Sequence, residues 1–99
     1  MDPTANTFQF LNKSVTTPGT ATALTEYLVP DGFVVVLTAR RSNTQSMFIA
    51  ETAAKAQSGA RKVLVPGQSI TMHIDKTSRI FVDSENSNDV LEVQIEQGT

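Results

Sequence analysis

The chain has 99 residues, of which 39% are hydrophobic, and its formal net charge at pH 7 is −2. A chain of this length folds as one domain with a modest core, and so small a net charge does not by itself predict a nucleic-acid or membrane partner. It contains no cysteine, which excludes a disulfide framework and a zinc site built on thiolates. No stretch approaches the roughly 20 apolar residues of a membrane span, so we expect a soluble protein synthesised in the cytoplasm.

The first seven residues, MDPTANT, show no periodicity, and we expect an extended N-terminal arm over 1–7 followed by a single domain over 8–99. From there apolar and polar residues alternate with a period of two, which is typical of half-buried strands. The pattern predicts strands at about 7–15, 20–29, 32–41, 45–51, 61–65, 68–75, 78–83 and 89–96. We interpret ETAAKAQSGA, between the fourth and fifth of these, as a loop. Short strands separated by Pro-Gly turn signals predict an all-β, antiparallel β-sandwich that is jelly-roll-like.

The tripeptide LVP occurs at residues 28–30 and again at 64–66. In both places a tight turn, a second strand, a polar loop and a short third strand follow, which indicates a repeated unit. Two such units, each a meander, would stack face to face into a sandwich with pseudo-two-fold symmetry. The alternative is that LVP recurs by chance, because leucine and valine are common residues.

Aligned without a gap, the two copies predict which face of each second strand points inward. The residues expected to face the core are Val34, Val36, Ile70 and Met72. The alignment leaves Phe33, Val35 and Leu37 on the opposite face, so this strand is apolar on both sides and needs a second cover. That cover is either the N-terminal strand with Phe8 and Phe10 or another protein chain, and the sequence leaves both open.

Charge is segregated along the chain. Residues 40–79 contain seven basic and two acidic residues, whereas residues 80–99 contain five acidic residues and no basic one. Such a distribution suits contacts between copies, or it simply solvates two exposed edges. The candidate interface combines the apolar stripe with two of these cations: Phe8, Phe10, Phe33, Val35, Leu37, Arg40 and Arg41.

Residues with catalytic or ligand-binding chemistry are few. His73 and Asp75 share one strand face, but nothing nearby marks a nucleophile, so we interpret His73 as a surface residue. The loop DSENSND at 83–89 offers oxygen ligands of the kind that calcium prefers, without the spacing or the central glycine of an EF-hand. Arg40 and Arg41 lack the aromatic platform that nucleic-acid bases stack on. We therefore expect no enzyme, no catalytic residue, no metal, no cofactor and no direct nucleic-acid partner.

Three stretches occur in a fixed order: LVPGQSI at 64–70, SRIFV at 78–82 and VLEVQIE at 90–96. In this order they resemble a pattern found in small all-β virion proteins of tailed bacteriophages. The preceding VPDGFVVVLTARRSNTQSMFIA is similar to the leading half of the same module. The resemblance covers about 70 residues, excludes the N-terminal 25, and consists of turn and strand patterns without catalytic residues.

The resemblance implies a structural protein of a phage virion, most simply a capsid decoration (cement) protein on the capsid surface, made in the host cytoplasm. Its partners would be the major capsid protein and further copies of itself, and no membrane. Because a lone sandwich would leave the apolar stripe at Phe33, Val35 and Leu37 half covered, we expect a homo-oligomer, most simply a trimer at capsid threefold positions. The alternatives are a head–tail or tail accessory virion protein, or a sugar-binding β-sandwich module of an adhesin.

Overall fold

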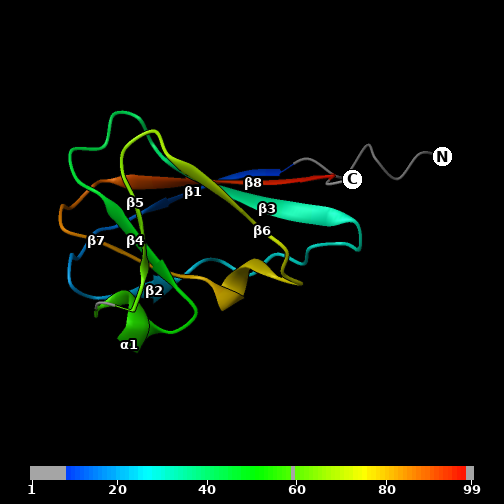
Figure 1. Ribbon diagram of the computed structural model, residues 1–99, viewed down its shortest axis with the longest axis horizontal. Helices are drawn as coiled ribbons and strands as arrows, with labels where there is room; N and C mark the ends of the chain where they lie inside the picture. The colour runs from blue at the N-terminus through cyan, green and yellow to red at the C-terminus, as the bar shows by residue number, and fades with distance from the viewer. Residues whose placement is uncertain (1–8, 59, 98–99) are drawn as a thin grey trace.

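The computed structural model describes residues 9–58 and 60–97, which form two antiparallel sheets joined by loops (Figure 1). The strands are β1 (Gln9–Ser14), β2 (Thr22–Ala23), β3 (Phe33–Ala39), β4 (Met47–Ala50), β5 (Lys62–Leu64), β6 (Ser69–Met72), β7 (Phe81–Ser84) and β8 (Val90–Gln97). Sheet A has the order β1-β8-β3-β6, and sheet B has the order β2-β7-β4-β5. The predicted all-β sandwich is confirmed, whereas the predicted arm over 1–7 and Phe8 lie outside the described residues.

The strand order is that of a jelly roll, in which one long hairpin is folded across itself. The two arms of the hairpin pair as β1 with β8, β2 with β7, β3 with β6 and β4 with β5. Ser14 pairs with Val90 and Thr22 with Val82, so neither arm carries an insertion between these pairs. The prediction of two meanders is wrong, because the middle strand of each repeated unit lies in the opposite sheet from its neighbours.

Two glycines show how the repeated units correspond. Gly32 and Gly67 have φ angles of 84° and 89°, a region that glycine adopts without steric cost. The N–H of Phe33 donates to the carbonyl of Pro30, three residues back, and the N–H of Gln68 donates to the carbonyl of Val65. The second turn therefore starts at Val65, one residue before its proline, so the repeated letters and the repeated structure are offset by one residue.

That offset reverses the faces expected for β3, since a slip of one residue moves every side chain to the other side of a sheet. Val35 and Leu37 are fully buried and lie opposite Ile95 and Val93 of β8, inside the sandwich. Val34 and Val36 alternate with them, opposite Glu96 and Gln94 of β8, and therefore lie on the outer face of sheet A. Val34 is nevertheless only 6% exposed, although it is not part of the core cluster. The sequence-based prediction of an exposed stripe at Phe33, Val35 and Leu37 is wrong for this reason.

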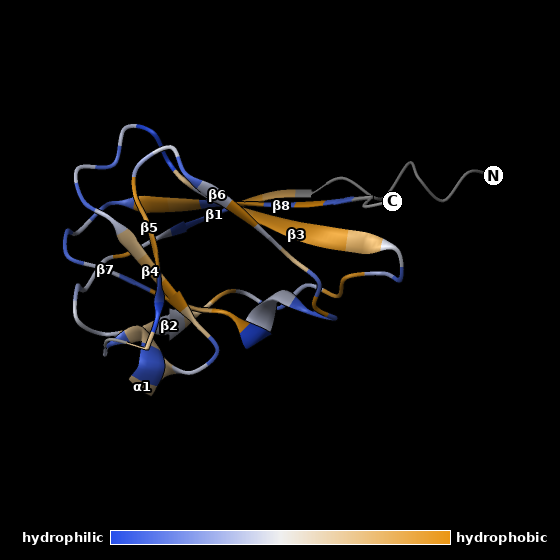
Figure 2. Cartoon of the chain, viewed as in Figure 1, coloured by the Kyte–Doolittle hydropathy of each residue, from blue (hydrophilic) through white to orange (hydrophobic). Residues whose placement is uncertain are grey.

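The core lies between the sheets, and β3 is apolar along its length (Figure 2). The cluster of buried side chains consists of Val15, Leu24, Val29, Val35, Leu37, Ala39, Met47, Ile49, Leu64, Ile80, Val82, Leu91, Val93 and Ile95. Phe33, Ile70 and Met72 pack against it and are only partly buried. The inward orientation expected for Ile70 and Met72 is therefore confirmed.

The outer face of sheet B has its own small cover at the tip of the hairpin. The helix α1 (Ala53–Ala56) occupies part of the segment predicted as a loop, and the hydroxyl of Thr52 caps it by accepting from the N–H of Lys55. The guanidinium of Arg61 lies over the ring of Phe48, 3.4 Å from its centroid, and Phe48 is 6% exposed. A cation stacked on an aromatic face replaces part of the ring's contact with water.

Candidate interaction surface

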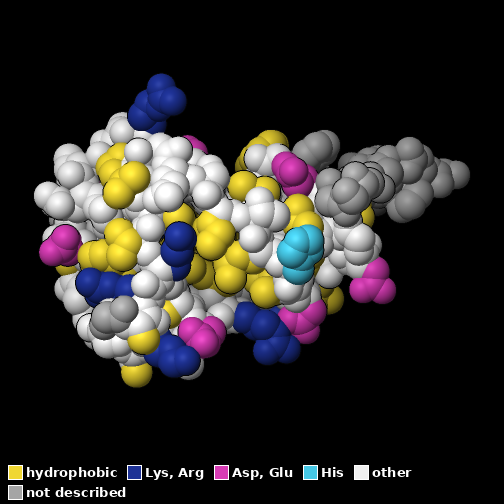
Figure 3. Space-filling model, viewed as in Figure 1, with side chains coloured by type: hydrophobic (Ala, Val, Ile, Leu, Met, Phe, Trp, Pro, Cys, Tyr) yellow, Lys and Arg dark blue, Asp and Glu magenta, His cyan; other side chains and the backbone are white. Residues whose placement is uncertain are grey.

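The sandwich is open along the side where β5 and β6 form the last strands of their sheets. An apolar groove of about 390 Å³ lies there, and we call it the edge groove. Its apolar lining includes Ile49, Ile70, Met72, Ile74 and Ile80. Figure 3, which views this side, shows apolar side chains exposed in a band across the middle of the molecule.

The short length of β5 explains the groove. β5 contains three residues, Lys62–Leu64, because Pro66 and Gly67 turn the chain immediately afterwards. Leu64 is fully buried, but Val63 and Val65 on either side of it are 42% and 52% exposed. Val63 and Val65 alternate with Leu64, so they lie on the outer face of sheet B and outside the lining of the groove. Inside the sandwich β5 ends at Leu64, and Ile70, Met72 and Ile74 beyond it remain only partly buried.

Charged side chains line the mouth of the groove. The guanidinium of Arg79 donates to both carboxylate oxygens of Asp75, with Nη2 3.2 Å from Oδ2, and this hydrogen bonding lowers the pKa of Asp75. Glu51 accepts from the ammonium of Lys55 at 3.1 Å. Among the described residues Lys62 has no carboxylate within ion-pair distance, so it is the cation at the mouth that remains available to an acidic group of a partner.

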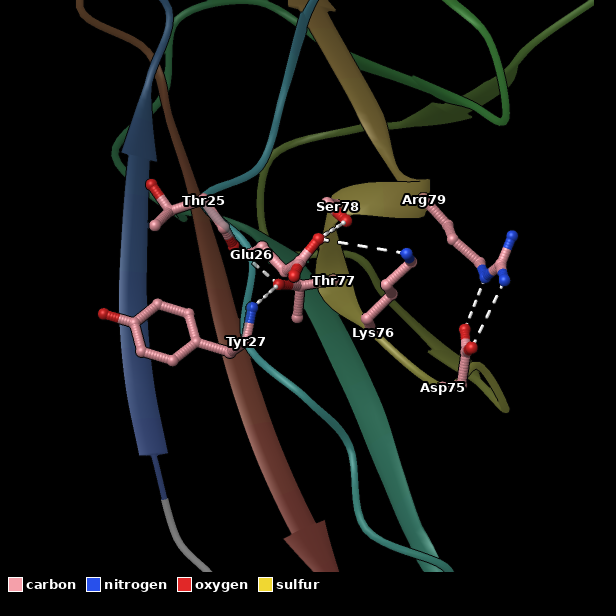
Figure 4. Close-up of polar contacts among 8 residues, drawn as sticks. All are labelled: Thr25, Glu26, Tyr27, Asp75, Lys76, Thr77, Ser78 and Arg79. Carbon is pink, nitrogen blue, oxygen red and sulfur yellow. Dashed lines mark hydrogen bonds and ion pairs between the residues drawn. The ribbon is translucent and has the colours of Figure 1, made fainter.

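A polar cluster centred on Thr77 fixes the chain beside the groove (Figure 4). The Thr77 hydroxyl is fully buried, donates to the carbonyl of Thr25 at 2.6 Å and accepts from the N–H of Tyr27 at 2.8 Å. Ser78 donates to Glu26 at 2.8 Å from the next position. These bonds hold Thr25–Tyr27 against the 3₁₀ turn at Thr77–Arg79, which explains why β2 and β7 are shorter than predicted.

The contacts of Asp75 also show whether it pairs with His73. Both oxygens of Asp75 are bonded to Arg79, and no hydrogen bond joins Asp75 to His73 in the described part of the chain. His73 is exposed, which confirms its interpretation as a surface residue. Asp75 therefore does not orient His73 as a general base for a nucleophile.

The residues predicted for an interface do not form one surface. Val35 and Leu37 are in the core, Phe33 is half-buried against it, and Phe10 is 73% exposed on the outer face of sheet A. Arg40 donates to Glu92 at 3.0 Å on that same outer face, and Arg41 is exposed in the loop between β3 and β4. The structure thus brings only the pair Phe10 and Arg40 together, at a shallow pocket on sheet A.

Sequence reasoning assigned the side chains of the edge groove to the core and therefore missed it. The available signal was the distance between the arginine and lysine at 61–62 and the turn at Pro66-Gly67, which leaves room for only a very short strand. Such a strand cannot cover a longer neighbour whose residues alternate Ile70, Met72 and Ile74.

The acidic loop at 83–89 is occupied by internal hydrogen bonds. Asp83 and Asp89 are each 3% exposed, and Asp83 accepts from the N–H of Gly19 at 2.9 Å. Burial by itself would raise the pKa of Asp89, but hydrogen bonds from the N–H groups of Thr44 and Gln45 and from Asn86 outweigh it and lower the pKa. Two of the five acidic residues in 80–99 therefore bind loops of the same chain.

Across residues 9–58 and 60–97 no group of three or more histidine, cysteine, aspartate or glutamate side chains is arranged to hold a metal ion. Within the same residues, no helix is long and apolar enough to cross a membrane. The chain matches no family model, no curated protein and no solved structure.

Proposed function

We propose that the chain is a structural protein of a tailed-phage virion that acts as a capsid decoration (cement) protein. The observation that supports this most is the edge groove, an apolar surface on a small β domain that is open to solvent between two sheet edges. Exposed apolar side chains that gather in one place, with polar groups around them, often mark a site of contact with another protein. The resemblance of LVPGQSI, SRIFV and VLEVQIE to phage virion proteins supplies the kind of partner.

The proposed mechanism is adhesive. The groove buries apolar surface against the major capsid protein, at roughly 25 cal/mol per Å² removed from water. Lys62 adds a cation that attracts an acidic side chain of the capsid protein. A protein that binds the assembled shell and not its separated subunits stabilises the shell by mass action.

The expected trimer loses its basis, because it depended on an exposed stripe at Phe33, Val35 and Leu37. The proposal keeps the major capsid protein and further copies of the chain as partners on the capsid surface, and it assigns no threefold position.

The test is binding of the purified chain to phage particles that lack it, measured as occupancy by sedimentation and as the temperature at which the shell releases DNA. Ala60 lines the groove and is exposed, so Ala60→Glu places a charge at the groove without disturbing the core, and we expect it to weaken binding by about tenfold or more. The matched control is Ser14→Glu, which adds the same charge at an exposed position on β1, far along the sheet order from β5 and β6.

Full occupancy by both variants would contradict the assignment of the edge groove as the capsid-binding surface. No binding of the natural chain to any particle would contradict the function.

A further inference from the structure

The free edge of β6 has a defined set of unpaired backbone groups. At its start the N–H of Gly67 donates to the carbonyl of Ala39 at 2.7 Å, and the N–H of Ala39 donates to the carbonyl of Gln68 at 3.0 Å. This is a bulge with a positive-φ glycine at its first position. Beyond it, hydrogen-bonded and non-hydrogen-bonded pairs alternate along an antiparallel ladder, so Ile70 and Met72 bond with β3.

The alternation leaves Ser69, Thr71 and His73 with their N–H and C=O groups directed away from β3. All three residues are exposed, and β6 pairs with no other strand in the described part of the chain. Edge strands of natural sheets usually carry a charge or a proline that blocks pairing. The sequence of β6, SITM, carries neither.

We propose that β6 pairs with β6 of a second copy of this chain, antiparallel, about a two-fold axis at Thr71. In this register Thr71 lies opposite Thr71 of the second copy, and Ser69 lies opposite His73. The residues brought into hydrogen-bonded pairs are those whose backbone groups point outward. The pairing joins the two copies of sheet A into one continuous sheet.

The side chains match in the same register. On the inner face Ile70 lies opposite Met72 of the second copy, in a non-hydrogen-bonded pair where side chains are closest. On the outer face two threonine hydroxyls meet, and no like charges face each other. If two copies of β5 paired in the same way about a two-fold axis at Val63, Lys62 would lie opposite Leu64 of the second copy. Leu64 is apolar and gives the ammonium of Lys62 no partner. Self-complementarity therefore favours β6 and a second copy.

The edge groove connects this pairing to the rest of the surface. Ile70, Met72 and Ile74 line the groove in each copy, so the two grooves adjoin across the axis and part of each apolar lining is covered. A contact of four-residue strands is smaller than the roughly 800 Å² per partner of a standard interface. We accordingly expect a weak dimer.

The proposal does not rest on the proposed function. A two-fold contact of identical surfaces closes as a dimer, not as a trimer.

Single cysteines test the register, because the natural chain has none. In Thr71→Cys the two Cα atoms of a dimer are about 5.5 Å apart, within the range of a disulfide. In Ser69→Cys the two cysteines are displaced by four residues along the strands, about 13 Å. Both positions are exposed and lie on the same face of β6, so Ser69→Cys is a matched control.

Under mild oxidation of isolated protein we expect Thr71→Cys to form a covalent dimer at least tenfold faster than Ser69→Cys. Equal rates would show random collision and overturn the register. Sedimentation equilibrium of the natural chain gives a second measurement, with the average mass rising toward that of a dimer as concentration increases. A monomer mass up to millimolar concentration would overturn the dimer.

A charge pair at the axis completes the test. Thr71→Lys and Thr71→Glu should each raise the dimer Kd at least tenfold, and an equimolar mixture should restore association. Association that is unchanged in Thr71→Lys would overturn the proposal. All three measurements use isolated protein, so their outcome is separate from capsid binding.

Discussion

Asp89 connects two loops at one end of the sandwich. Its carboxylate accepts from the N–H of Thr44 at 3.1 Å and from the N–H of Gln45 at 3.0 Å, both in the loop before β4, and from the amide of Asn86 at 3.3 Å in its own loop. A buried carboxylate with several donors stabilises the folded state only while it is ionised. A calcium ligand and an acceptor of internal hydrogen bonds both require oxygen atoms, so the sequence of the loop does not distinguish the two roles of Asp89.

We predict that Asp89→Asn lowers the free energy of unfolding at pH 7 by about 1–3 kcal/mol. The pKa of Asp89 is lowered in the folded state, so the natural chain is stabilised by this carboxylate above its ordinary pKa of 3.8 and loses that contribution as pH falls through the folded value. Asp89→Asn should therefore reduce the fall in stability that the natural chain shows as the pH is lowered through and below 3.8. Urea unfolding over this range measures the effect.

Glu85→Gln is the control for that experiment, since Glu85 is an exposed acid in the same loop. We expect it to change stability little. If Glu85→Gln and Asp89→Asn had equal effects, net charge and not the hydrogen bonds of Asp89 would be responsible.

At the level of elements, the turn glycines determine the register of the strands that follow. Gly67 has a φ of 89° and nothing lies within 4 Å of an added Cβ, so the cost of a side chain there is conformational and not steric. We predict that Gly67→Ala lowers the free energy of unfolding by about 1–2 kcal/mol. Gly67→Asn should cost less, because asparagine tolerates this region better. Thermal unfolding of both variants checks the order, and a larger loss for Gly67→Asn would contradict it.

The strands could be predicted because their alternation is local, and six of the eight expected strands coincide in large part with observed ones. The exceptions are 20–29 and 78–83, where Thr77 bonds to Thr25 and Tyr27 and the chain leaves the ladder. These hydrogen bonds join segments about fifty residues apart, and the alternation of apolar and polar residues within one segment does not predict them. The faces of β3 failed for a related reason, since a bulge at Gly67 shifts the alignment by one residue without changing the pattern of letters.

Alternation alone does not predict the edge groove, because Ile70 and Met72 have the same pattern in a covered and in an uncovered strand. Whether they are covered depends on which strands become neighbours across the sandwich, and that is a property of the whole jelly roll. The pairing of β3 with β8, which places Val35 and Leu37 in the core, is likewise a long-range consequence of the fold.

For the whole molecule, the core residues described above all lie between Val15 and Ile95. We predict that deleting residues 1–7 leaves the sandwich folded and weakens capsid binding, because an extended arm adds backbone and side-chain contacts to a partner. Circular dichroism and particle occupancy measure the two effects separately. Unchanged occupancy would remove the arm from the mechanism, and loss of folding would place it in the core.

The folded hairpin also has a consequence for how the chain is made. β1 leaves the ribosome first, yet it pairs with β8, the last strand, and β3 also has β8 as a neighbour. Sheet A therefore cannot assemble before β8 has been synthesised, whereas β4 and β5, at the tip, can pair as soon as they emerge. Pairings so distant in sequence form slowly. Until synthesis reaches β8, one edge of the apolar strand β3 has no native neighbour, and an unpaired apolar edge of this kind favours aggregation.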